Sequence, residues 1–288
     1  MLRRSFMKLG GLSLFSSILG LSSKTSRIAQ ADEQTVNPLK SYWSKDGYFI
    51  QENVDTSETP ERIWARVDGK WKVYPIAKLP LPFLVWNMER RLQSIDDMLN
   101  MKDMHFDGSH NAAVATYSDL PRLDSQFKLN NAIKGMGMCP KQDRIRDFID
   151  EYKATIDYST SMKLQILKQK YENLENWDRN RQISLELYTK QNWETHTFLN
   201  QMRNAESTVV FLDMTSYEIR TIAKLVHPDD PNISQEEKNC VEYSNMVHKF
   251  FHGDPIEFIG VIYYVIEVFD NSPRTTPRGK RVVPSYDY

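Results

Sequence analysis

The chain has 288 residues, of which 40% are hydrophobic and 11% aromatic, with a formal net charge of −1. This apolar content suffices for a folded core and excludes an intrinsically disordered chain. Only two cysteines occur, so iron–sulfur and haem-attachment motifs, which need clustered cysteines, are excluded.

The first 31 residues contain five basic residues and no acidic one. A charged start, the apolar stretch from Leu9 to Leu21 and the small residues Ala29 and Ala31 follow the order of a signal peptide. The start, Arg3-Arg4-Ser5-Phe6-Met7-Lys8, resembles a twin-arginine (Tat) export signal in Arg3, Arg4, Phe6 and Lys8. It departs from that pattern at Met7, where Leu is usual, and at Leu2, where Ser or Thr is usual.

The resemblance implies export of an already folded protein by the Tat machinery and removal of residues 1–31 by signal peptidase. The mature chain, from Asp32 onward, would then reach the periplasm or the extracellular space. The apolar stretch is shorter than the roughly 20 residues that span a bilayer, so we expect no permanent membrane anchor. Loss of the five basic residues leaves 32 Lys and Arg against 38 Asp and Glu, a net charge of about −6. That balance argues against a nucleic-acid partner.

Residues 32–60 are polar and predict an irregular N-terminal segment, followed by one domain over residues 61–270. Two alternating runs flank Asp68-Gly69 and predict a β-hairpin near 62–75, because a type I′ turn needs positive φ at both central positions. Apolar residues at three- and four-residue spacing predict a helix over 83–104, and a short helix is expected over 124–134.

Residues 141–227 contain neither Gly nor Pro, between Pro140 and Pro228. A single helix of that length would be several times longer than a domain of this size is wide. The stretch therefore predicts shorter helices that fold back on each other. The run at 208–212 is rich in β-branched residues, so a strand remains an alternative to a helix there.

Ser234 and Glu237 form the pattern of a capping box and predict a helix that ends near Phe251. Asp254 and Pro255 suggest the start of a second helix, apolar nearly all round and ending near Phe269. The tail at 271–288 is rich in Pro and Arg and is expected to be mobile or to lie on the surface. The predicted fold is therefore mostly α: a single-domain, helical-bundle-like fold with a small N-terminal β-hairpin.

Cys139 and Cys240 form a candidate disulfide, because an exported protein enters an oxidising compartment. Since Tat cargo folds before export, such a bridge would reinforce a fold that already stands. The sequence leaves open whether the two cysteines pair.

His248 and His252 stand four residues apart on a predicted helix and could face one metal ion. Further ligands would come from Asp254 and from the loop that carries His105, Asp107 and His110. The alternative interpretation is that the two histidines complement the negative end of the helix dipole and bind no metal.

The sequence favours an exported, soluble accessory or interaction protein, a candidate subunit of a redox complex, with a protein partner after export. The alternative is a metal-dependent enzyme, such as an oxidoreductase, that uses His248 and His252 with the loop histidines; its only implied cofactor is a metal ion. A third hypothesis is a small-ligand binder with a helical pocket lined by Tyr263, Tyr264 and tryptophans.

Overall fold

The computed structural model describes residues 42–102, 108–118, 125–253, 255–274 and 277–285. The export signal at residues 1–31 and residues 32–41 of the segment at 32–60 lie outside these ranges. The metal candidates His105, Asp107 and Asp254 also lie outside them. The described residues belong to one unit, which extends from Tyr42 to the C-terminus.

The prediction of a mostly α fold is wrong. The described residues form eleven strands and five α-helices; 32% of the residues are helical and 33% lie in strands. All strand pairs are antiparallel. The chain is therefore a sheet protein with helices packed against it and not a helical bundle.

A small three-stranded sheet opens the fold, with β1 at Val54–Asp55, β2 at Arg62–Val67 and β3 at Lys70–Pro75. The turn between β2 and β3 is made by Asp68 and Gly69, with φ of 50° and 77°. Positive φ at both positions is the signature of a type I′ turn, so the hairpin lies where the Asp-Gly pair predicts it.

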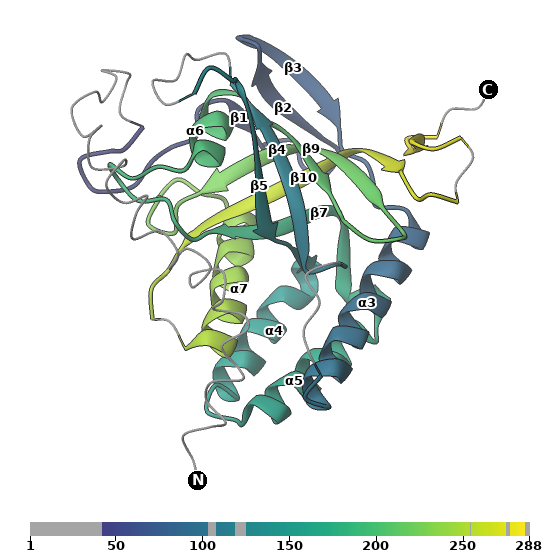
Figure 1. The fold of residues 1–288 in the computed structure, drawn as a ribbon. Helices are drawn as coiled ribbons and strands as arrows, with labels where there is room; N and C mark the ends of the chain where they lie inside the picture. Colours follow the sequence, from purple (N-terminus) through teal and green to yellow (C-terminus); the bar gives the residue numbers. More distant parts are fainter. Residues whose placement is uncertain (1–41, 103–107, 119–124, 254, 275–276, 286–288) are drawn as a thin grey trace, which may run out of the picture. The chain divides into compact units, whose positions relative to one another are not determined.

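The main sheet has eight strands in the order β5-β4-β8-β9-β10-β7-β6, with β11 paired to β10 (Figure 1). Its strands are β4 Asn111–Tyr117, β5 Leu129–Gly135, β6 Gly137–Pro140, β7 Trp177–Glu186, β8 Glu206–Val210, β9 Tyr217–Val226, β10 Ile259–Asp270 and β11 Lys280–Val283.

The main sheet curls into a half-barrel, and one chain segment connects its two ends. Only Met136 separates β5 from β6, yet β5 pairs with β4 and β6 pairs with β7. The hydroxyl of Ser184 on β7 donates to the carbonyl of Gly135 at 2.7 Å, which ties the junction to β7. The β5–β6 segment therefore draws the first and last strands of the sheet together.

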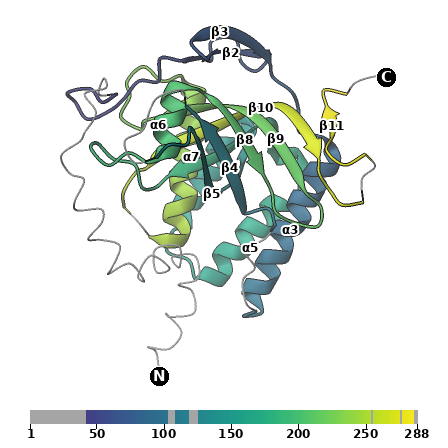
Figure 2. The ribbon, with the colours of Figure 1, turned by 45° about the horizontal axis from the view of Figure 1, so that its top comes forward.

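Five α-helices accompany the sheet: α3 at Leu81–Leu99, α4 at Gln142–Ala154, α5 at Thr160–Tyr171, α6 at His196–Arg203 and α7 at Gln235–His252. Figure 1 shows α3, α4, α5 and α7 gathered on one side of the strands, with α6 apart from them, and Figure 2 shows α3 and α5 side by side from a second direction. Helix α7 packs on β10 and β7, α4 packs on α7, and α3 packs on α5. In the described ranges, no helix has the length and apolar character needed to span a bilayer.

The capping box predicted at Ser234 is confirmed. The Ser234 hydroxyl accepts from the backbone N–H of Glu237, and the Glu237 carboxylate accepts from the backbone N–H of Ser234. Gly253 ends α7 in the left-handed region, with φ of 70°, where a glycine carries no steric penalty. The first helices of the 141–227 stretch, α4 and α5, are also helical as predicted, but α5 ends at Tyr171.

The remainder of that stretch is a correction. Beyond residue 176 it forms β7, the short helix α6, β8 and β9. The absence of Gly and Pro misled the prediction, because long buried strands need neither residue. Strand β9 has buried side chains on both faces, so it lacks the alternation of a half-buried strand.

Two further predicted helices are strands. The expected helix at 124–134 is occupied by β5, and the expected buried helix at 255–269 is β10. The first seven residues of β10 are buried because α7 covers one face and the interior of the half-barrel covers the other. An apolar run of this kind does not reveal its period, and its β-branched residues favour the strand. Part of the tail at 271–288 forms β11, paired with β10.

Candidate functional site

The rings of His248 and His252 lie side by side near the end of α7. Their centroids are 4.6 Å apart, and His248 also meets the ring of Phe258 edge-on at 5.1 Å. His105, Asp107 and Asp254, the expected further ligands, lie outside the described residues. Within the described ranges no group of three or more His, Cys, Asp or Glu side chains is arranged to hold a metal ion.

His110 takes part in a different group of side chains, beneath α3. Its Nδ1 lies 3.2 Å from a guanidinium nitrogen of Arg91, which itself is 2% exposed. Burial is the main cause that lowers the pKa of His110 to about 3, and the Arg91 charge lowers it further. His110 is therefore neutral near pH 7, and its Nδ1 accepts the hydrogen bond while Nε2 carries the proton.

Arg91 on α3 binds the segment that joins β5 to β6. Its guanidinium donates to the carbonyls of Ser109 and Met136 at 2.9 and 2.8 Å, and its Nε donates to the Asn87 side chain at 2.7 Å. Met136 is the junction between β5 and β6, so one side chain of α3 holds the point at which the sheet turns back. These donors are all used within the protein, which indicates a structural role. In the sequence, the signal for this structural role is Asn87 and Arg91, two polar residues four positions apart on an otherwise apolar helix face.

The two cysteines come together. Cys139 lies at the register break of β6 and Cys240 lies on α7, and their Sγ atoms are 3.5 Å apart. Both are buried free thiols in the structure. The candidate disulfide partners are therefore neighbours, although the bond is not formed.

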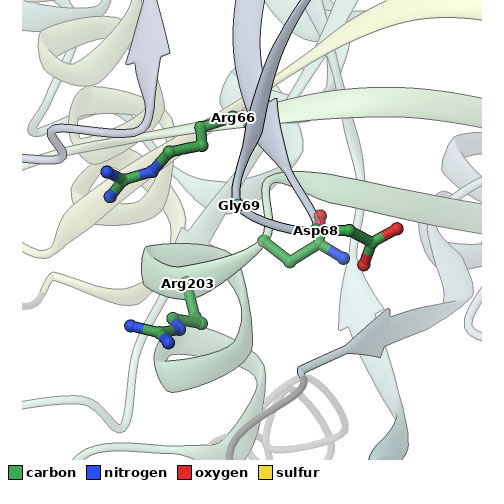
Figure 3. Close-up of a pocket in the computed structure, with 5 residues that line it drawn as sticks. Arg66, Asp68, Gly69 and Arg203 are labelled. Atoms are coloured by element: carbon green, nitrogen blue, oxygen red, sulfur yellow. The ribbon is translucent and has the colours of Figure 1, made fainter.

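A small pocket lies between the β2–β3 turn and the end of α6. It has a volume of about 160 Å³ and is lined by Arg66, Asp68, Gly69, Arg203 and Asn204; we call it the arginine pocket. Figure 3 shows the guanidinium groups of Arg66 and Arg203 extending to the same side, with the Asp68 carboxylate directed to the other. Two such groups on one side favour an oxyanion.

The surroundings of the arginine pocket weaken that interpretation. Asn204 follows the last turn of α6, whose free carbonyls carry partial negative charge. Arginines near a helix C-terminus complement those carbonyls without any ligand. A bound anion in the arginine pocket would therefore compete with the carbonyl groups at the end of α6 for the two arginines, which makes this site weaker than the surface described next.

The exposed face of β4 and β5 is the most distinctive surface. Leu129 and Ile133 on β5 are 63% and 56% exposed, and Tyr117 on β4 is 36% exposed. The register places Leu129 opposite Tyr117, and Ile133 opposite Ala113. Directly paired residues share one face of a sheet, so these side chains lie on one surface, together with the exposed Asn131 between Leu129 and Ile133. We call Ala113, Ala115, Tyr117, Leu129 and Ile133 the outer strip. Phe127, which precedes β5, is 77% exposed.

The same face continues into charged residues of both signs. Strand β8 pairs Val210 with Glu218 and Thr208 with Arg220, which carries the face onto β9. Arg220 bonds to Glu218 at 3.0 Å and to Glu267 at 3.3 Å, and Arg281 bonds to Glu267 at 2.7 Å. We call Glu218, Arg220, Glu267 and Arg281 the charged rim. An apolar centre with a polar rim is the usual anatomy of a protein interface.

Sequence reasoning missed the outer strip because it placed the region around His110 in a loop and residues 124–134 in a helix. A signal was present in β5, where exposed apolar residues alternate with polar residues such as Asn130 and Lys134 that turn inward. Asn130 bonds to Thr197 on α6, and Lys134 pairs with the buried Glu186 at 2.6 Å. Asn130 and Lys134 thus turn inward, whereas Leu129 and Ile133 face outward with Asn131 between them, so the two largest apolar residues of β5 lie on its exposed side.

Comparisons with known proteins add little to this picture. No family model matches the chain, and no curated protein matches it. Among solved structures, the chain is similar to HupZ of Group A Streptococcus at 14% identity, over 63% of this chain and 94% of that one, with a TM-score of 0.32. A TM-score of that size does not establish a shared fold.

Proposed function

We propose that this protein is an exported interaction protein, without chemistry of its own, that binds a protein partner through the outer strip. The observation that carries the proposal is the outer strip itself: two large aliphatic side chains more than half exposed on the outer face of the sheet, with Tyr117 beside them. Exposed apolar patches that are rimmed by polar residues mark interaction surfaces.

The charged rim supports a protein as the partner. Glu218 and Glu267 stand beside Arg220 and Arg281, so the rim presents both signs within one row. A nucleic acid or an anionic lipid surface favours arginine and lysine alone. A protein surface with its own mixed charges can pair with both members of each rim bridge, and such complementarity fixes its orientation.

Small residues support close approach. Ala113 and Ala115 lie at the middle of the outer strip, between β5 and β8. Two flat sheet faces pack about 10 Å apart when the side chains between them interdigitate. The flanking Leu129, Ile133 and Tyr117 can then enclose the partner around the two alanines.

The test compares the full precursor with two variants in a host that exports it. Ile133→Lys places a charge in the outer strip, whereas Tyr158→Lys places the same charge on an exposed residue between α4 and α5. We expect the wild type and Tyr158→Lys to migrate in an assembly larger than the 33.8 kDa chain, and Ile133→Lys to migrate alone. The measured mass identifies the partner as a second copy or another subunit. A wild-type chain that is monomeric at its native level would refute the proposal.

A second candidate function is the binding of a small oxyanion in the arginine pocket, favoured by the two guanidinium groups that extend to the same side (Figure 3). Phosphate or a short dicarboxylate would then raise the unfolding temperature of the wild type. The rise would disappear in Arg66→Gln, with Arg62→Gln as the matched exposed control on the same strand. Equal shifts in both variants would assign the effect to nonspecific salt.

A further inference from the structure

We propose that Cys139 and Cys240 are a modification site: a buried dithiol that oxidises to a disulfide after export, with Cys240 as the attacking thiol and Cys139 as the resolving thiol. The two sulfurs are 3.5 Å apart on elements far apart in the sequence. The step needs little rearrangement, because β6 and α7 already hold both side chains face to face. The inference concerns a different part of the fold from the outer strip and does not depend on it.

The hydrogen bonds around the pair distinguish the two sulfurs. Cys240 Sγ accepts from Nε2 of Gln142 at 3.5 Å and faces the thiol of Cys139. Cys139 has a single thiol proton, and both the Cys240 sulfur and the carbonyl oxygen of Pro140, 3.3 Å away, lie within reach of it. A hydrogen bond donated from Cys139 to Cys240 lowers the pKa of Cys240, burial raises it, and the Arg181 charge lowers it. The same bond raises the pKa of Cys139, and burial adds to it. Cys240 is thus the sulfur that ionises first.

Arg181 on β7 supplies the nearby positive charge. Its guanidinium is almost completely buried, bonds to Asp178 at 2.8 Å and also pairs with Glu236 on α7. It lies over the ring of Tyr264 at 5.4 Å. Because the two carboxylates hold this group in place, its charge stays fixed beside the dithiol whether or not the thiols are ionised.

The reaction requires an oxidant of the disulfide class, such as oxidised glutathione or a protein disulfide oxidase. The Cys240 thiolate attacks one sulfur of the oxidant, forms a mixed disulfide and expels the first thiolate, which takes up a proton. Cys139 then loses its proton and attacks the Cys240 sulfur, which expels the second thiolate. Two electrons pass from the cysteines to the oxidant. Access comes from local opening of β6, a four-residue edge strand with a break in its register.

The bond would fasten the end of the half-barrel. Strand β6 is the last strand of the sheet and continues from β5, so a bond from Cys139 to α7 would hold the closing segment against the helix layer. Because the bond would close a loop of about 100 residues, we expect the oxidised protein to unfold about 5–15 °C above the reduced one.

The first experiment alkylates thiols in the denatured full chain and measures its mass. We expect the exported chain to take up no alkyl group and to give a peptide that links Cys139 to Cys240. The precursor held in the cytoplasm by Arg3→Lys with Arg4→Lys should take up two alkyl groups. Two alkylated cysteines in the exported chain would overturn the inference.

The second experiment needs no export and tests the order of attack on the purified, reduced full chain with oxidised glutathione. Cys139→Ser should accumulate a glutathione adduct on Cys240 at least about tenfold faster than Cys240→Ser accumulates one on Cys139. Equal rates, or faster reaction of Cys139, would overturn the assignment of Cys240 as the attacking thiol. Failure of the wild type to form the internal bond would overturn the site.

Discussion

Two regions on one face of the main sheet have opposite environments. On β10, the face that carries Gly260 and Ile262 lies under α7, and Ile262 is 1% exposed. On β5, the outward face carries Ile133, which is 56% exposed. Both residues are isoleucines in antiparallel strands of one sheet, so β propensity does not distinguish them. The difference is the presence of a covering layer: within the part of the chain that the structure describes, no element covers Leu129 and Ile133.

The largest effect is expected where the covering layer is tightest. Ile262→Lys would bury an ammonium group between β10 and α7, where the described neighbours are apolar or already paired. An unpaired buried charge costs several kcal/mol, so we expect a loss of about 5 kcal/mol in the free energy of unfolding or complete failure to fold. Chemical denaturation measures this. A loss below about 1 kcal/mol would show that α7 does not cover β10.

The second effect concerns pH and the buried His110. Its pKa of about 3 lies below the ordinary value of 6.5, so the unfolded chain binds a proton that the folded chain refuses. The stabilisation from neutral His110 is therefore complete above about pH 6.5 and is lost as the pH falls toward 3. At pH 3 the loss is on the order of 4 kcal/mol.

The control for this pH effect is His110→Gln, which cannot titrate in that range. We expect the wild type to lose more stability than His110→Gln between pH 6.5 and 4, as measured by denaturant unfolding at each pH. Parallel curves for the two proteins would mean that His110 is exposed to solvent and titrates normally.

The third effect is the close approach of α7 to β10. A Cβ added at Gly260 would meet Cγ2 of Val241 at 2.6 Å. Gly260→Ala should therefore destabilise the protein by about 1–3 kcal/mol through overpacking. Val241→Ala in the same chain should recover part of that loss, because it removes the colliding methyl group. A double variant no more stable than Gly260→Ala would place the strain elsewhere.

The smallest effect is expected in the uncovered region of the sheet, at the outer strip. Ile133→Lys should change the free energy of unfolding by no more than about 0.5 kcal/mol, because the side chain is already exposed. Ile262→Lys and Ile133→Lys introduce the same charge, once beneath α7 and once on the uncovered outer strip. A loss above about 2 kcal/mol would mean that Ile133 packs within its own chain.

The sequence predicted the elements whose signals are local. The Asp68-Gly69 turn, the capping box at Ser234 and the apolar faces of α4 and α5 all depend on residues a few positions apart. They were assigned correctly because no distant contact is needed to interpret them. Helix α3 was also predicted, with its end placed at 104 where the structure has Leu99.

The sheet could not be predicted in the same way. Strands β7, β9 and β10 are buried on both faces along much of their length, so their apolar residues show neither the period of two nor a helical period. Their partners are distant in sequence, and β5 and β6 pair at opposite ends of the strand order. The outer strip depends on which part of its sheet face α7 covers, which no local pattern encodes. The cysteine pair, in contrast, was suggested by counting alone, and its proximity needed the structure.

The most direct test of the interaction proposal is covalent footprinting of the exported protein in its assembled state and after dissociation. A carbene reagent labels exposed side chains without regard to charge. We predict that Leu129, Ile133 and Phe127 are labelled at least about fivefold less in the assembly than after dissociation. Tyr158, between α4 and α5, and Met162, on α5, should be labelled equally in both states. Equal labelling of Leu129 and Ile133 in both states would contradict the account.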